Sequence, residues 1–435
     1  GINKGYMYMA DLATEPRWQR IEGTFGEDAE LAGKMMKEIV LGFQGKQLGA
    51  GSVALTTKHF PGGGSGEGGQ DPHFDWGKKE VYPGGMFDNN LIPFRAAIDA
   101  GTSAIMPYYS MPSGTEYDEV GFAYNKRILQ EILRGELGFK GIINSDTGPI
   151  EMMPWGVENL TIIERYKMAL EAGVNLFSGT AHPGLLIETL TKYPELMPLV
   201  DESVHKILLE KFQLGLFENP YVDLEAANQI VGKEEFKKKA EEAMRKSIVL
   251  LRNKENALPL KAKTKVYFET YMHIRNGSPS NVFSTENNTW GLEFVSTADE
   301  ADVVLLWLIP KGKSLFQSKG EPLHVNLAEN GVDVDYVKNL INKPTILAIN
   351  YTNPWAVDEI YKEGEDNINA VLATFGTTPE AVLDIVTGKF KPNGKMPFST
   401  PLSDEAAQNQ KSDVPGYLEG DGYEFFKFDE GMNSL

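Results

Sequence analysis

The stretch from Lys58 to His73 reads KHFPGGGSGEGGQDPH and concentrates side chains that can do chemistry. It holds two of the chain's six histidines, one lysine, two acids and six glycines. Three kinds of site can be built from such residues: a phosphate cradle, a loop that binds a divalent metal, or the rim of a pocket for a neutral, hydroxyl-rich ligand. Each kind makes different demands on the neighbouring sequence.

A phosphate site is disfavoured. Residues 64–69 satisfy the pattern G-x-G-x-x-G, which binds phosphate only when it follows a strand and opens a helix. Here a turn-forming Gln-Asp-Pro sequence follows, and the carboxylate of Glu67 would repel phosphate. A metal loop would use Asp71, His73 and Asp75. No second ligand pair is visible, so we interpret these residues as a solvated polar loop and expect no metal.

The third kind of site rests on Lys58 and His59, which end an apolar run. Charged donors at the end of a strand point into a pocket and can grip sugar hydroxyls, while glycines let the backbone come close. A Lys-His pair that simply ends a strand at the surface explains the residues equally well.

Asp146 ends another buried run, in ELGFKGIINSDTGP. An aspartate here commonly caps the following turn, and the residues alone favour that role. The alternative is a nucleophilic carboxylate held rigidly in a pocket floor. Retaining glycosidases place such a group about 5 Å from a proton donor.

The elements that position these residues are short and β-rich in the first half. Helical patterns separate them, as in 125–139, where Ile128, Leu129, Ile132 and Leu133 share one face. Repeated βα units indicate a parallel sheet, either a TIM-like (β/α) barrel or a doubly wound sheet. Five strands do not close a barrel of eight, so the sheet is open or upstream strands are missing. The five candidate strands are 5–11, 53–60, 102–109, 139–146 and 173–179.

The second half contains a helical region and then a second β-rich segment. An apolar stripe of Val204, Ile207, Leu208 and Phe212 is interpreted as packing. We predict a barrel domain over 1–215, a helical connection over 216–245 and an α/β sandwich over 246–435, onto which the aromatic tail packs. Candidate strands in the second domain are 246–260 in part, 265–270, 301–310, 344–351, 369–376 and 394–401.

The bulk composition excludes some functions. The chain has 435 residues, no cysteine and a formal net charge of −19, which disfavours nucleic-acid binding and excludes thiolate chemistry. No apolar run has the length needed to span a bilayer. The chain begins with Gly1 rather than Met, and we expect that the natural start has been removed.

Five spaced motifs resemble the family 3 glycoside hydrolases: residues 15–45, KHFPGGG, LRGELGFKGIINSD, SIVLLRNKENALPL and GKMPFSTP, in that order. The resemblance covers about 5–430. It implies a TIM-like barrel followed by an α/β sandwich domain. It also implies a retaining, exo-acting β-glycosidase, most simply a β-glucosidase that releases the terminal non-reducing glucose.

The resemblance assigns roles residue by residue. Asp146 matches the catalytic nucleophile, and Lys58 and His59 match the pair that binds hydroxyls of the terminal sugar. Arg20 matches a sugar-binding arginine, with Arg17 as the alternative, and Tyr109 is similar to a tyrosine near the nucleophile.

The acid/base stays open between two candidates. In many members it is a glutamate of the second domain, where Glu321 is the nearest carboxylate and Gln317 an equally plausible match. A branch of β-N-acetylhexosaminidases uses a His-Asp pair, which His73 and Asp71 resemble. The rival functions are therefore that activity, a catalytically inactive sugar-binding relative and a phosphate-dependent enzyme.

The expected partners are β-linked glucosides or oligosaccharides, with no organic cofactor or redox metal. An incomplete barrel would expose sheet edges. It therefore predicts either a homo-oligomer or a complementary N-terminal segment. Many bacterial relatives are exported, which favours a periplasmic or extracellular location.

Overall fold

The computed structural model describes residues 1–180, 182–272, 288–312 and 319–435. These residues form two compact units. The first contains Gly1–Ala227 together with 319–323 and Lys411–Pro415, and the second contains the other described residues. Among the described residues, every helix is too short or too polar to cross a bilayer.

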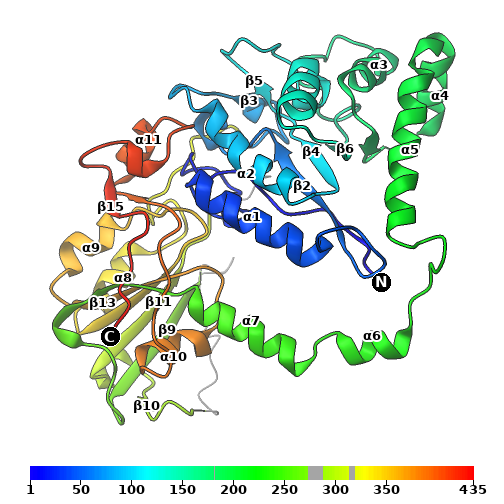
Figure 1. Ribbon diagram of the computed structural model, residues 1–435. Helices are drawn as coiled ribbons and strands as arrows, with labels where there is room; N and C mark the ends of the chain where they lie inside the picture. Colours follow the sequence, from blue (N-terminus) through cyan, green and yellow to red (C-terminus); the bar gives the residue numbers. More distant parts are fainter. Residues whose placement is uncertain (181, 273–287, 313–318) are drawn as a thin grey trace. The chain divides into compact units, whose positions relative to one another are not determined.

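One parallel sheet organises the described part of the first unit (Figure 1). Its strand order is β1-β2-β4-β6-β7, and all neighbours run parallel. The residues of β4 are all apolar and buried, as expected for a central strand of a parallel sheet covered by helices. Four of the five predicted strands are thus confirmed, whereas the prediction over 5–11 is mostly wrong, since β1 includes only Gly5 of that range and Met9 makes an isolated bridge to Lys58. The bounds of the strands are Lys4–Gly5, Ala54–Phe60, Ala104–Pro107, Ile142–Thr147 and Leu176–Ser178.

Helices connect these strands in the expected alternation. Asp28 caps α1 by accepting a hydrogen bond from the Leu31 amide at 2.7 Å, and Thr161 and Glu164 form a capping box at the start of α3. The helix predicted within 125–139 is present, and its four apolar residues are buried. The helices are α1 (Ala29–Gln44), α2 (Phe87–Asp99), η5 (Arg127–Glu136), α3 (Ile162–Ala172), α4 (Pro183–Lys192) and α5 (Met197–Gln213).

The carboxyl ends of the strands gather the polar residues. Beyond β1 the chain continues beside β2, since the Ala10 amide donates to the Lys58 carbonyl at 2.6 Å. Asp11 therefore lies next to His59 at the end of β2. Tyr108 directly follows β4, and Asp146 lies at the end of β6. Parallel strands end at the same edge, so all these side chains meet there.

A second sheet forms the core of the second unit. Its strand order is β10-β9-β11-β12-β13-β8, and of the described strands in this sheet only β8 runs antiparallel to its neighbour. Trp307, Ile346 and Leu372 lie in its buried core. The strands are β8 (Val249–Asn253), β9 (Lys265–Met272), β10 (Glu293–Phe294), β11 (Val303–Ile309), β12 (Thr345–Asn350) and β13 (Ile368–Thr374). The helices are α7 (Glu234–Lys246), α8 (Val334–Leu340), α9 (Asp358–Gly364), α10 (Pro379–Val386) and α11 (Asp404–Asn409), and α6 (Leu224–Ile230) precedes them.

The aromatic tail packs onto the second unit as predicted. Strand β15 (Glu424–Phe426) pairs with β14 (Thr400–Pro401), and Phe426 is fully buried. The predicted strand over 394–401 is mostly wrong, because only its last two residues pair. Three prolines and one glycine in and beside it (391–401, KPNGKMPFSTP) limit the backbone donors and the regular extended geometry that a strand needs.

The interpretation of the α5 stripe as packing is wrong for this structure. Val204, Leu208 and Phe212 are 48%, 41% and 55% exposed. Polar contacts hold the helix instead: Glu210 pairs with Lys4 at 2.8 Å, and the Ser203 hydroxyl accepts from the Asn175 side chain at 3.0 Å. Helical periodicity identifies an apolar face but not whether anything covers it.

Candidate active site

His59 is held from one side by Asp11. The imidazole Nδ1 lies 2.9 Å from Asp11 Oδ2, and the His59 and Gly63 amides also donate to this carboxylate, at 3.2 and 2.6 Å. Burial alone would raise the pKa of Asp11, but its contacts with His59 and Gly63 and the charge of Arg20 hold that pKa below its ordinary value. Asp11 is therefore a buried carboxylate with all its partners in place.

Arg20 approaches His59 from the other side. Its guanidinium donates to Tyr108 Oη at 3.0 Å and lies 3.1 Å from His59 Nε2. Burial and the nearby Arg20 charge lower the pKa of His59. We therefore assign a neutral imidazole that donates from Nδ1 to Asp11 and accepts at Nε2 from Arg20. Arg17, the alternative from sequence, is instead engaged with Glu15 at 2.7 Å.

Asp146 faces this cluster from the end of β6. Its Oδ2 lies 3.9 Å from His59 Nε2, and its Oδ1 accepts from the Thr147 amide at 2.7 Å. The side chain is nearly buried. Because His59 is neutral and its Nε2 accepts from Arg20, Asp146 Oδ2 and His59 Nε2 face each other without a hydrogen bond or an ion pair. The amide contact is to the next residue, not to an amide two or three residues further on as in a helix cap, and it leaves Oδ2 on the side that faces His59.

Two aromatic residues and a lysine flank Asp146. Tyr109 donates to the Thr147 carbonyl at 2.8 Å, and burial and the Asp146 charge raise the pKa of its phenol. Tyr6 donates to the Ser145 carbonyl at 3.3 Å. Lys58 Nζ lies 5.1 Å from the centre of the Tyr6 ring. Burial and Arg20 lower the pKa of Lys58, and the Asp146 charge opposes that shift.

Asp71 and His73, which follow the glycine-rich loop after β2, form a hydrogen-bonded pair. Asp71 Oδ1 contacts His73 Nδ1 and also accepts from the His73 amide at 3.0 Å. Burial would raise the pKa of Asp71, but His73 and the Arg20 charge lower it below its ordinary value. The His73 ring lies edge-on to Tyr109, with centroids 4.9 Å apart. His73 therefore contacts Tyr109, which in turn bonds to the residue next to Asp146.

The other sequence candidates lie farther from this contact network. The Glu321 side chain is exposed, and its carbonyl accepts from Gln70 Nε2 at 2.7 Å. Gln317 lies outside the described residues. Asp75 is exposed. Within the described ranges, no group of three or more His, Asp or Glu side chains has an arrangement that could hold a metal ion.

Sequence reasoning recognised Asp11 and Tyr108 as polar residues at strand ends but gave them no role, and it missed Tyr6. Asp11 and Tyr108 had a visible signal, since each is a polar residue at the end of an apolar strand. Tyr6 carried none, because it lies inside the first predicted strand.

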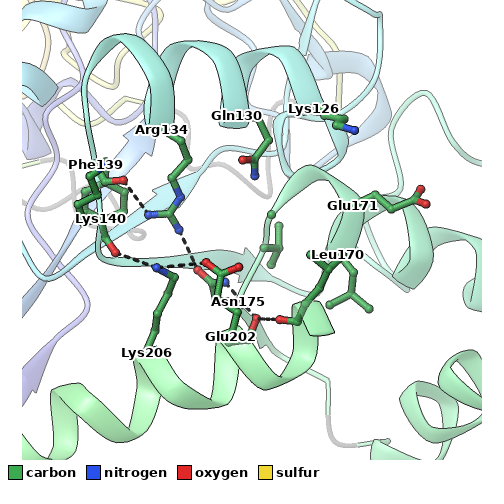
Figure 2. A pocket seen from close by; sticks show the side chains of 14 residues that line it. Lys126, Gln130, Arg134, Phe139, Lys140, Leu170, Glu171, Asn175, Glu202 and Lys206 are labelled. Carbon is green, nitrogen blue, oxygen red and sulfur yellow. Dashed lines mark hydrogen bonds and ion pairs between the residues drawn. The ribbon is translucent and has the colours of Figure 1, made fainter. Parts of the chain in front are cut away.

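A separate pocket of about 450 Å³ lies at the opposite edge of the sheet (Figure 2). It is lined by residues that precede β6 and β7, such as Lys140 and Asn175, and by side chains of η5 and α5. Its polar groups bond to one another: Arg134 donates to the Phe139 carbonyl and to Asn175 Oδ1, both at 3.0 Å. Ligands of such sheets bind at the carboxyl ends of strands, so the cluster around Asp146 is the candidate site.

Comparisons with known proteins identify the family of the chain. The description "Glycosyl hydrolase family 3 N terminal domain" matches residues 1–209, and "Glycosyl hydrolase family 3 C-terminal domain" matches residues 248–434. The chain is 40% identical to a probable β-glucosidase C of Aspergillus flavus, over 100% of this chain and 68% of that protein. The chain belongs to glycoside hydrolase family 3.

This family 3 chain has further relatives. It is 40% identical to β-glucosidase C of Emericella nidulans over 95% of this chain and 67% of that protein. A β-glucosidase from Listeria innocua, solved with laminaribiose, shares the fold with a TM-score of 0.79 and 24% identity, over 99% of this chain and 65% of that one. The chain thus spans about two thirds of the length of these relatives. The TIM-like domain followed by an α/β sandwich is confirmed.

Proposed function

We propose that this family 3 hydrolase is a retaining, exo-acting β-glucosidase with Asp146 as its nucleophile. The observation that carries the proposal is the cluster at the strand ends, where Asp146 meets the hydroxyl-binding candidates Arg20, Lys58 and His59. Relatives named β-glucosidases, 40% identical over 95–100% of the chain, support the substrate class. The hexosaminidase, inactive and phosphate-dependent alternatives have no such support.

The chemistry follows from this arrangement. Asp146 attacks the anomeric carbon and forms a glycosyl ester, while a proton donor protonates the leaving oxygen. The transition state carries positive charge on the sugar ring, so the carboxylate stabilises it electrostatically. Arg20 and Lys58 bind sugar hydroxyls, and Asp11 keeps the His59 imidazole in one tautomer for the same purpose.

The proton transfer has two candidates. Glu321 is the first, on the strength of its match to the family's glutamate. His73 is the alternative: Asp71 holds its Nδ1, which leaves Nε2 to donate to the leaving oxygen and later to accept a proton from water. The His73 ring also lies against Tyr109, beside Asp146.

A trapping experiment tests the nucleophile. The protein is incubated with a 2-deoxy-2-fluoro-β-glucoside that carries a good leaving group, which slows hydrolysis of the glycosyl-enzyme. We expect a mass increase of one fluoroglucosyl group, and peptide mapping should place it on Asp146. A label on another carboxylate would overturn the assignment, and turnover of an ordinary aryl β-glucoside without any label would argue against retention.

We also propose that the protein is exported from the cytoplasm. A relative from Dickeya chrysanthemi, 34% identical, is named a periplasmic β-glucosidase/β-xylosidase. Detection of the protein in periplasmic or culture fractions would test export.

We further propose that the apolar face of α5 is covered. The exposed apolar residues of α5 support coverage by a second copy or by a complementary segment. Mass measurement by light scattering distinguishes a dimer from a monomer, and limited proteolysis reports whether α5 is protected.

A further inference from the structure

Glu80 carries a buried carboxyl group that the proposed mechanism does not use. The residue is fully buried, and both of its side-chain oxygens are bonded. Oε1 accepts from the Ser65 amide at 2.8 Å and lies 3.0 Å from the Ser65 hydroxyl, and Oε2 lies 2.7 Å from the Ser110 hydroxyl. One side chain thus joins the glycine-rich loop after β2 to the segment that follows β4.

The glycine-rich loop leads from Ser65 to the buried carboxylate of Asp11. The Gly63 amide donates to Asp11 at 2.6 Å, and the same carboxylate holds His59. A Cβ on Gly63 would lie 2.6 Å from a ring carbon of Tyr108, so the loop backbone packs closely against that ring. A shift of Ser65 would therefore disturb the contacts of Asp11 and His59.

The second segment leads from Ser110 to the nucleophile. Ser110 directly follows Tyr109, whose phenol donates to the Thr147 carbonyl at 2.8 Å. Thr147 is the residue after Asp146 at the end of β6. A shift of Ser110 would therefore move the aromatic side chain that lies beside the nucleophile.

Backbone pairing holds the Glu80 segment independently of its side chain. Strand β3 (Lys79–Glu80) pairs with β5 (Met111–Pro112), and the Val81 amide donates to the Ser65 carbonyl at 3.1 Å. These bonds involve no side chain. Truncation of Glu80 should therefore leave the local fold in place and remove the side-chain contacts alone.

The surroundings of Glu80 determine its protonation state. Burial raises its pKa to about 8 against the effect of the serine hydrogen bonds, and the charge of Asp11 also raises it. Tyr82 and Tyr108, which interact electrostatically with Glu80, stay neutral because burial raises their pKa values well above the ordinary value. Glu80 is thus a neutral acid near pH 7. Such an acid donates from one oxygen and accepts at the other, and a serine hydroxyl can match either role.

We propose that Glu80 is a positioning residue that clamps the glycine-rich loop to the segment after β4 and thereby fixes Asp11 and Tyr109 around the bound sugar. This inference rests on the proposed function, since it takes the cluster at the strand ends as the glucoside site. Glu80 acts through these residues and not on the sugar itself. Its ionisation would add a buried negative charge that Asp11 repels, which would loosen the clamp.

The first test compares Glu80→Gln with Glu80→Ala at pH 6.5. Glutamine has the shape of the neutral acid and keeps an acceptor and a donor, so we expect its kcat/KM for 2,4-dinitrophenyl β-glucoside within about threefold of wild type. Alanine leaves the Ser65 amide without its acceptor and separates the two segments. Because a displacement of about 1 Å can cost on the order of 100-fold in rate, we expect kcat/KM of Glu80→Ala to fall about 10- to 100-fold.

The pH dependence is a readout that a merely structural role would not move. The leaving group of the dinitrophenyl glucoside needs no proton, so the acid/base contributes little to the loss of kcat/KM at high pH. With a Glu80 pKa of about 8, wild type should lose about tenfold between pH 6.5 and pH 9 through this group. Glu80→Gln has no proton to lose there, so its kcat/KM relative to wild type should rise about tenfold over the same range.

Glu67→Gln and Glu67→Ala are the matched controls, because Glu67 is an exposed acid of the segment that leads to Glu80. Both should keep the wild-type kcat/KM and pH profile. Ser110→Ala removes one end of the clamp and should also lower kcat/KM. In a double-mutant cycle, the effect of Ser110→Ala should largely disappear in the Glu80→Ala background. Circular dichroism at both pH values checks that each variant is folded.

Several outcomes would overturn the clamp. These are wild-type activity in Glu80→Ala, equal losses in Glu80→Gln and Glu80→Ala at pH 6.5, parallel pH profiles for wild type and Glu80→Gln, or additivity of Ser110→Ala with Glu80→Ala. If Glu80→Ala does not fold, the pH profile of Glu80→Gln and the activity of Ser110→Ala decide the question. A wild-type protein that hydrolyses no β-glucoside would instead contradict the proposed function.

Discussion

His73 and Glu321 are the two candidates for the proton donor, and they lie in different surroundings. Kinetic measurements can distinguish them. His73 is fixed by Asp71, whereas the side chain of Glu321 is exposed. If His73 is the proton donor, His73→Ala should reduce kcat/KM for methyl β-glucoside by about 10²- to 10⁴-fold and affect an activated dinitrophenyl glucoside much less. Glu321→Gln should leave kcat/KM for both glucosides within about threefold of the wild-type values.

The reversed pattern would transfer the role to Glu321. Azide adds a second measurement, because a small anion can replace a missing base in the second step. Recovery of turnover by azide in His73→Ala, with a β-glucosyl azide product, would support His73. Recovery in Glu321→Gln alone would contradict it.

Glu80 makes a residue-scale prediction about pH and stability. It is fully buried and accepts from the Ser65 amide at 2.8 Å and from the Ser110 hydroxyl at 2.7 Å. Burial, opposed by these hydrogen bonds, raises its pKa from 4.5 to about 8. The folded state therefore binds one more proton than the unfolded state between those values. The free energy of unfolding should fall as pH rises through this window, by at most about 1.4 kcal/mol per pH unit from this group.

Glu80→Gln should remove that dependence. Urea unfolding at pH 5, 6.5 and 8 should show that the free energy of unfolding of the variant rises relative to that of wild type as pH increases. Glu67→Gln is the control, because Glu67 is an exposed residue of the segment that leads to Glu80 and pairs with Lys79 at 3.4 Å. Parallel curves for wild type and Glu80→Gln would show that Glu80 ionises normally in the folded state.

At the scale of elements, the glycine-rich loop after β2 is shaped by close backbone contact. A Cβ on Gly64 would lie 1.8 Å from the Leu12 carbonyl oxygen. The Gly64 carbonyl accepts from the Glu15 amide at 3.0 Å and from the Thr14 hydroxyl at 3.1 Å. The loop thus runs against the segment that leads from Asp11 toward Arg20.

Gly64→Ala should therefore push these two segments apart. We expect a loss of about 1–3 kcal/mol in the free energy of unfolding, as in other overpacked sites, and a larger loss of activity than of stability. Gly51→Ala is the control, since a Cβ there meets open space. Wild-type activity in Gly64→Ala would show that the loop can move without disturbing Asp11.

At the scale of the whole molecule, a distant segment completes the first unit. Lys411–Pro415 belongs to that unit although the chain has passed through the second sheet. Asp413 is buried there and accepts from the Gly84 and Met86 amides at 2.7 and 2.8 Å. These contacts join residues more than 300 positions apart.

Asp413→Ala should leave two amide donors without their charged acceptor. We expect a loss of about 1.5–3 kcal/mol in the free energy of unfolding, measured by urea denaturation. Asp421→Ala, at an exposed position of the same C-terminal region, should change it by less than about 0.5 kcal/mol. Equal effects of the two substitutions would mean that the 411–415 segment adds no stability through Asp413.

Much of this architecture was predictable because it depends on local pattern. Short buried runs such as 139–146 became parallel strands, and the apolar face of η5 is buried. Ligands of parallel sheets bind at the carboxyl ends of the strands, and this generalisation pointed to Lys58, His59 and Asp146. It could be applied because a residue's place at the end of a strand is encoded locally. The strand over 394–401 and the packing of α5 were not predictable in the same way, since pairing and coverage depend on distant residues.

The sequence by itself determined which residues could do chemistry and at which strand ends they lie, and its motifs indicated the family. Only the tertiary structure decided which of them work together. It joined Asp11 to His59, chose Arg20 over Arg17 as the partner of that imidazole, and linked Asp71 to Arg20 through Tyr108. Hydrogen bonds act over about 3 Å, so such a network exists only once the folded sheet brings β2, β4 and β6 side by side.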